Sequence, residues 1–220
     1  MGIIGHDNEI FHVHPILQPR PHVGSAPITL DHILSHDFDG PLSRRQRYSI
    51  ALLVASSVGQ LQSTPWLRNG LCKKDIVFFP PSDDANLTIP YGEPFLRQGF
   101  SHGRAHLAST GSSADAHNFY ALGILLLELC FGRRLEDLAL RKKYPPTSDA
   151  AATHAFDVMA ALKWSSSVSG EGGDDYAAAV KWCFMNAADI ENNWRGEIVR
   201  NVVRPLEICM EHFRTVSGVA

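Results

Sequence analysis

Residues 115–132 read DAHNFYALGILLLELCFG, and this stretch decides how the rest of the chain folds. From Ala121 to Gly132 every residue except Glu128 is apolar or glycine, so the stretch has no polar face to turn toward water. It is also too short to cross a bilayer. The sequence therefore predicts a central, buried helix that ends at Gly132, a favoured residue for the C-terminal cap.

A second strong helix is predicted at residues 41–63, PLSRRQRYSIALLVASSVGQLQS. Ser43 and Gln46 have the spacing of a capping box, in which each side chain bonds the other residue's backbone amide. Arginines occupy positions 44, 45 and 47, although the helix dipole disfavours cations at this end. They are interpreted either as solvated charge or as a functional patch. The apolar face repeats at helical spacing through Ile50, Leu53, Val54, Val58 and Leu61.

A loop follows this helix, with the sequence WLRNGLCKKDIVFF at residues 66–79. Trp66 and Leu67 are expected to anchor it, and DIVFF is typical of a short strand that stops at the following prolines. NLTIPY, residues 86–91, is the predicted partner strand, so we expect a small two-stranded ribbon. Residues 92–115 show no apolar period and are expected to form a loop.

The remaining segments complete a mainly α fold. Residues 1–28 have no periodicity and are expected to form an extended arm that covers the loop between Gly70 and Asp75. The domain itself is predicted to span residues 29–216. Toward the C-terminus the pattern predicts a helix at 150–165, a flexible break at 167–175, a helix at 176–186, and a last helix at 191–214 kinked by Pro205.

Composition narrows the functional classes. The net charge of −3 over 220 residues gives no support for nucleic-acid binding, which requires a basic face. The four cysteines, Cys72, Cys130, Cys183 and Cys209, lack the close spacing of a zinc site. The start of the chain does not resemble a signal peptide. We therefore expect an intracellular, cytoplasmic protein with reduced thiols and no membrane span.

The order of these elements resembles the C-terminal lobe of a protein kinase. SIALLVASSVGQLQSTPWL resembles the helix before the catalytic loop, and RNGLCKKDIVFF resembles that loop in the register H-R-D-x-x-x-x-N. NFYALGILLLELCFG resembles the buried helix that follows. Together with AVKWCF and EIVRNVVRPLE, these stretches are similar to a fungal family of unknown function with a kinase-like C-terminal region, which occurs in proteins linked to incompatibility and cell-death signalling.

In that register the residues needed for phosphoryl transfer are missing. Gly70 falls at the position of the catalytic Asp, while Asp75 falls at the position of the metal-binding Asn. The D-F-G aspartate position is Pro90 or nearby. A glycine-rich loop with a strand lysine is not found upstream, so the resemblance implies that the N-terminal lobe is absent. Asn118 replaces the Asp that braces the catalytic loop in kinases, and its amide is expected to keep that bracing role.

The sequence therefore predicts a catalytically inactive, pseudokinase-like module that binds protein partners, without cofactor, metal or catalytic residues. One alternative is a divergent nucleotide- or phosphate-binding enzyme that uses Asp75, and with it Asp83 or Asp84. Another is a truncated lobe with no role of its own. Asp75 is the one weak candidate for cofactor binding.

Three further patterns in the sequence could indicate a functional site, and each also has a structural explanation. His12 and His14 in HVH have the spacing of metal ligands on a strand, but lie in a segment predicted to be loose. Cys72 lies beside two lysines that favour a thiolate, although a partly buried, inert thiol is the preferred reading. The four tryptophans are expected to pack in the core rather than to form a ligand cage: Trp66, Trp164, Trp182 and Trp194.

Overall fold

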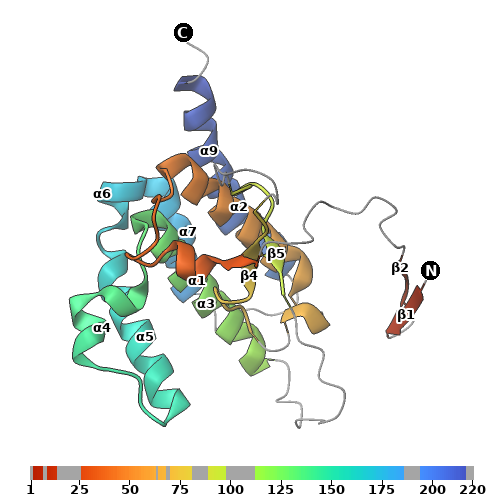
Figure 1. Ribbon diagram of the computed structural model, residues 1–220, viewed down its shortest axis with the longest axis horizontal. Coiled ribbons are helices and arrows are strands. Elements are labelled where there is room, and N and C mark those ends of the chain that lie inside the picture. Colours follow the sequence, from red (N-terminus) through yellow and green to blue (C-terminus); the bar gives the residue numbers. More distant parts are fainter. Residues whose placement is uncertain are drawn as a thin grey trace.

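Helices make up most of the structure, a computed structural model that describes residues 2–6, 9–13, 26–62, 64–67, 70–80, 89–97, 112–185 and 194–216 (Figure 1). The longer helices are α2 (Arg44–Leu61), α3 (Ser112–Phe131), α5 (Ala150–Ser165), α7 (Asp174–Met185) and α9 (Arg204–Val216). Shorter ones are α1 (Leu30–Ile33), α4 (Ala139–Lys143), α6 (Val168–Gly172) and α8 (Trp194–Ile198). The 3-10 turns are η1 (Pro65–Leu67) and η2 (Leu135–Asp137), and η3 (Val199–Val203) is a π-helical segment.

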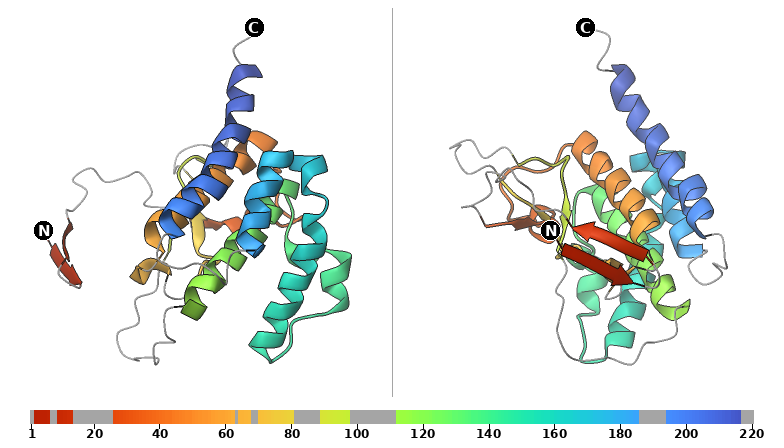
Figure 2. Two further views of the ribbon diagram at one scale, coloured as in Figure 1. Left: turned by 180° about the vertical axis from the view of Figure 1, so that it is seen from behind. Right: turned by 90° about the vertical axis from the view of Figure 1, so that its right-hand side faces the viewer.

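The central helix is α3, as the apolar stretch at 115–132 predicts. It packs against α2 and α7, and the views of Figure 2 show it enclosed by other helices. Its fully buried side chains include Leu122, Leu126, Leu127 and Leu129. The helix ends as expected, because Gly132 adopts a φ of 68° and donates its amide hydrogen to the carbonyl of Glu128 at 2.8 Å.

The predicted capping box is present at the start of α2. The Ser43 amide donates to Gln46 Oε1 at 2.8 Å, and the Gln46 amide donates to Ser43 Oγ at 3.3 Å. These bonds satisfy amide groups that the first turn of a helix leaves open. Behind this cap, Ile50, Val54 and Val58 face the core.

The sheet differs from the expected two-stranded ribbon. It has three antiparallel strands in the order β3 (Ile28–Thr29), β4 (Ile76–Phe78) and β5 (Phe95–Leu96). β4 was predicted, but the partner strand at 86–91 was wrong for its described residues, because 89–91 form no strand and Tyr91 lies in a turn. A two-residue strand shows no alternation, so neither β3 nor β5 could be recognised in the sequence.

The arm at 1–28 contains a β-hairpin of β1 (Gly2–His6) and β2 (Glu9–Val13), with Gly2 opposite Val13. In Figure 1 this hairpin is drawn beside the helical body, and the predicted cover of the loop by residues 1–28 stays a prediction. The end of the arm does reach the domain, since Ile28 pairs with Phe78. Residues 14–25, and with them His14, lie outside the described residues.

Two C-terminal predictions need correction. The predicted flexible break at 167–175 contains the short helix α6, anchored by the fully buried Val168, and Gly173 at a φ of 83° turns the chain into α7. The expected kink at Pro205 takes the form of the π segment η3 just before it. Because proline has no amide hydrogen, a widened turn accommodates the missing bond.

Across the described residues, no helix combines the length and the apolar character that crossing a membrane requires.

Candidate functional site

The loop that follows α2 is the site that the sequence singles out. It starts at the 3-10 turn η1, passes Gly70 and enters β4. Of the two predicted anchors only Leu67 is buried, whereas Trp66 has 42% of its surface exposed. Arg68 and Asn69, aligned with the first two residues of the kinase motif, lie outside the described residues.

Asn118 of α3 binds this loop through hydrogen bonds, as predicted for the residue at that position. Its Oδ1 accepts the Leu71 amide hydrogen at 2.9 Å, while its Nδ2 donates to the Leu67 carbonyl at 3.3 Å. The same amide group donates to Gln62 Oε1 at 3.1 Å, and Gln62 is buried at the end of α2. Asn118 itself is only 3% exposed. One neutral side chain therefore ties the loop to two helices, using both its acceptor and its donor.

Gly70 occupies a backbone conformation that favours glycine. Its φ is 90°, a region that costs other residues about 1–2 kcal/mol. A Cβ placed here would meet Asn118 Oδ1 at 3.8 Å, an ordinary contact, so the obstacle is conformational and not steric. The position aligned with the catalytic Asp is thus one in which an aspartate would be strained.

Lys73 is the most strongly held charge of the loop. Its Nζ lies 2.5 Å from Glu128 Oε1, 2.6 Å from Glu136 Oε2 and 3.6 Å from Asp31 Oδ1. Burial alone would lower the pKa of Lys73, but Glu128 and Glu136 offset this effect and raise the pKa above its usual value. The ammonium group therefore stays charged and is bound to carboxylates from α1, α3 and η2.

Glu128 is the buried partner in this network, with a side-chain exposure of 1%. Besides Lys73 it accepts the Leu135 amide hydrogen at 2.7 Å. Burial raises the pKa of Glu128 to about 7, and Lys73 opposes that rise. Sequence reasoning missed this network, although its signal was present: a single carboxylate in an apolar helix requires a buried partner.

A cavity of about 240 Å³ opens beside Lys73 and is bounded by the loop, α3, η2 and α5. Most of its charged groups are already paired within the chain. Lys73 holds Glu128 and Glu136, and Asp157 of α5 is bound by the buried Arg141 of α4. Among the described residues there is no cluster of three metal-ligating side chains.

Asp75, the weak candidate for cofactor binding, directly precedes β4, the central strand of the sheet. Its carbonyl accepts the Arg97 amide hydrogen at 2.7 Å, and its half-exposed carboxylate lies 3.8 Å from the Arg97 guanidinium. The other two aspartates of the enzyme alternative, at positions 83 and 84, lie outside the described residues. At the D-F-G position, Pro90 begins a turn, and the Tyr91 ring packs edge-on against Phe78 with centroids 5.9 Å apart.

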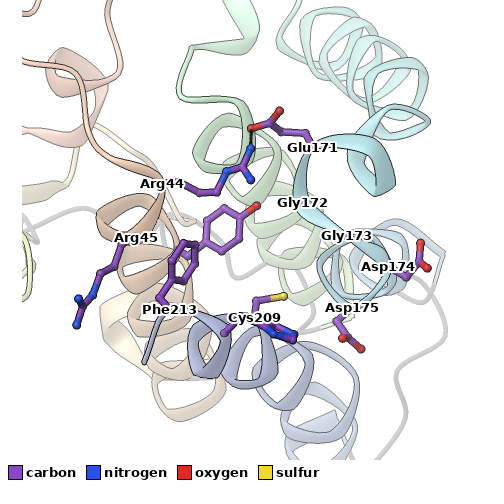
Figure 3. A pocket seen from close by; sticks show the side chains of 11 residues that line it. Arg44, Arg45, Glu171, Gly172, Gly173, Asp174, Asp175, Cys209 and Phe213 are labelled. Carbon is purple, nitrogen blue, oxygen red and sulfur yellow. Dashed lines mark hydrogen bonds and ion pairs between the residues drawn. The ribbon is translucent and has the colours of Figure 1, made fainter. Parts of the chain in front are cut away.

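A larger cavity of about 670 Å³ lies elsewhere, between the start of α2, the α6–α7 junction and α9 (Figure 3). Arg44 spans one side of it and donates to Glu171 at 2.7 Å. Its wall mixes arginines with acidic residues, including Asp174 and Asp175 at the start of α7, so it presents no single charge to a ligand.

Arg47, one of the three arginines at the start of α2, has a structural role. Its guanidinium donates to the carbonyls of Leu129 and Cys130 at the end of α3. These carbonyls have no partner within the helix, and the negative end of the dipole favours a cation there. Gly132 leaves room for the contact, because a Cβ would lie 3.0 Å from the Arg47 side chain. Arg47 therefore caps the C-terminal end of α3, 82 residues away in the chain. This contact explains why an arginine lies at the start of α2, where the dipole of α2 disfavours a cation.

The cysteines are all free. Cys130, Cys183 and Cys209 are buried, and burial raises the pKa of the Cys130 thiol to about 12. Cys72, predicted to be partly buried, is exposed. Of the tryptophans, Trp164 is buried against Phe131 with centroids 4.8 Å apart.

One comparison with known families bears on this arrangement. A family described as a domain of unknown function, DUF7580, matches residues 6–212. The chain belongs to this family. The match covers the sheet, the loop and nearly all helices of the DUF7580 domain, so the contacts of Asn118 and Lys73 lie within the family region. No match was found among curated proteins or among solved structures.

Proposed function

We propose that this DUF7580 domain is a catalytically inactive, kinase-like module that acts by binding protein partners. The observation that carries the proposal is Gly70, with its φ of 90° at the position aligned with the catalytic Asp. Glycine has no group to accept the proton of a substrate hydroxyl. Because that backbone conformation suits glycine, the loop is adapted to the absence of an aspartate there.

The charges around the loop support the same conclusion. Lys73 is the buried cation of the loop, and it neutralises carboxylates of this chain instead of a phosphate. Asp75, the remaining metal-ligand candidate, lies beside Arg97, whose positive charge disfavours a cation at that carboxylate. Pro90, at the D-F-G aspartate position, supplies no carboxylate.

What persists is the scaffold of the loop. Asn118 holds Leu67 and Leu71 in place, and a closed core of α2, α3, α7 and α9 lies below. A preserved scaffold without reactive groups fits a role in interaction or regulation. We further infer from the sequence resemblance a fungal, intracellular protein, since the similar family occurs in proteins linked to incompatibility and cell-death signalling; the resemblance does not name its partners.

Thermal unfolding with and without ATP and Mg²⁺ or Mn²⁺ tests the proposal. A nucleotide present at 100 times its Kd adds about 2.7 kcal/mol and would raise the Tm by about 5 °C or more. We expect no rise. A rise that Asp75→Ala abolishes, and that the control Asp149→Asn leaves in place, would contradict the proposal and favour the nucleotide-binding alternative. Circular dichroism of the same samples tests the fragment alternative, because an incomplete lobe should unfold broadly and not in one cooperative transition.

A further inference from the structure

The outward side of α5 is apolar along about three turns, from Ala151 to Leu162. Ala160, Ala161 and Trp164 face inward and are buried. Helix α5 itself lies at the lower edge of the body in Figure 1, near α4. Within residues 151–163, Lys163 is the one charged residue near this surface, and it stands at its margin. The surface, termed here the α5 face, consists of Ala151, Ala155, Val158, Met159 and Leu162.

The α5 face is exposed to solvent as well as apolar. Met159 is 43% and Leu162 is 47% exposed, and both alanines are exposed as well. A surface helix normally turns charged residues toward water, and a continuous apolar patch marks an interaction site. The steps of four, three and four residues from 151 to 162 match the seam of two packed helices. The face is therefore suited to receive another helix.

Its side-chain sizes are graded along the helix. The N-terminal half carries alanines, and the C-terminal half carries Met159 and Leu162. When two such helices run antiparallel about a two-fold axis, each large side chain meets a small one. The charges also fit the antiparallel arrangement, because Asp149 caps the start of α5 and Lys163 lies near its end. Asp149 of one copy would then face Lys163 of the other copy. Antiparallel helix dipoles are also favourably placed.

We propose that the α5 face binds a second copy of this chain, giving an antiparallel, two-fold symmetric homodimer. The proposal deepens the proposed role as an interaction module by naming one partner. The two are tested separately, because nucleotide binding and self-association are measured in different assays. The seam is about 24 Å long for 16 residues, and a contact through one helix pair is expected to be weak, so the dimer should form only at higher protein concentration.

A membrane surface fits the α5 face less well. Helices that lie on membranes carry many lysines and arginines on their polar side. In α5 the polar side has Thr153, His154 and Asp157, and its single basic residue of the lysine or arginine type is Lys163. Asp157 is moreover bound to Arg141.

Sedimentation of the full chain over a concentration series tests the dimer. The wild type should change from monomer to dimer below about 100 μM, and Met159→Glu or Leu162→Glu should raise the Kd at least about tenfold, because a charge would be buried in the seam. Ile208→Glu is the matched control, since Ile208 on α9 is also 43% exposed, and it should leave the Kd unchanged. Equal Tm values of the three variants show that folding is intact.

Cross-linking tests the antiparallel arrangement in a Cys72→Ser background, which removes the exposed thiol. With the axis near residue 157, two copies of residue 155 lie about 6 Å apart along the helix and two copies of residue 151 about 18 Å apart. A short bismaleimide should therefore link Ala155→Cys and not Ala151→Cys. The proposal would be overturned if the chain were still a monomer at about 100 μM, or if both cysteine variants were linked equally. Binding of the monomer to anionic vesicles, abolished by Met159→Glu, would also overturn it.

Discussion

Replacing Lys73 by methionine removes the cation that holds the loop to α3 and η2. Methionine keeps the apolar part of the lysine side chain and lacks its Nζ, so the main loss is the charge facing Glu128 and Glu136 at 2.5 and 2.6 Å. A buried ion left without its partner costs about 3–5 kcal/mol. Glu128 retains the Leu135 amide as a donor, so we expect the lower end, about 3 kcal/mol, where the carboxylate must stay charged.

The loss should depend on pH. Burial already raises the pKa of Glu128 to about 7, and without Lys73 that carboxyl binds a proton more readily still. At about pH 5.5 the group is then neutral, and the cost should fall to about 1–2 kcal/mol, that of a lost charged hydrogen bond. Urea unfolding at about pH 5.5 and about pH 8 measures both values. Adding Glu128→Gln to the Lys73→Met variant should restore part of the lost free energy of unfolding at about pH 8, because both members of the buried ion pair are then uncharged.

Lys74→Met is the matched control, because this neighbouring lysine is exposed and its replacement should change stability by less than about 0.5 kcal/mol. If Lys73→Met lost no more stability than Lys74→Met at about pH 8, the ion network would not hold the loop, and the reasoning would be refuted.

Three further outcomes follow from the same contacts. The pKa of Glu128 is raised to about 7, above its value in the unfolded chain. Its contribution to the free energy of unfolding is therefore complete below the unfolded pKa and is lost as the pH rises through about 7. Glu128→Gln should make the free energy of unfolding less dependent on pH in this range. Asn118→Ala removes bonds to Leu71, Leu67 and Gln62 and should cost about 2–4 kcal/mol by urea unfolding; a loss below about 0.5 kcal/mol would show that the loop is not braced there. Gly70→Ala should cost about 1–2 kcal/mol by thermal unfolding, because its φ is 90°, whereas Gly92→Ala, with open space and no such φ, should be near neutral; equal effects would contradict the conformational argument.

The parts of the fold predicted from sequence are those with a strong local signal. α2 and α3 each carry a helical apolar repeat and a recognisable cap, so their ends were placed within a few residues. The bracing role of Asn118 was inferred from its place in the resemblance to kinases. Its contacts with Leu67 and Leu71 bear out that inference.

The parts that escaped prediction depend on partners distant in the chain. β5 has two residues and exists because Val77 and Ile76 pair with it. α6 forms in a glycine-rich segment because Val168 is buried by tertiary packing, which overrides local propensity. The Lys73–Glu128 pair spans 55 residues, so no local pattern links its two members. The single carboxylate in the apolar helix α3 did indicate that a buried partner was required.

Leu71 is part of a loop by backbone geometry, yet its amide hydrogen is held by a buried side chain of the central helix. Exchange of that hydrogen with solvent requires its bond to Asn118 Oδ1 to break, and Asn118 is buried on α3 in the core. The Leu71 amide should therefore exchange with deuterium as slowly as the amide of Leu126, whereas the exposed turn at Gly92 exchanges quickly. By this measure, the loop at Leu71 belongs to the last cooperative unit of the molecule to open.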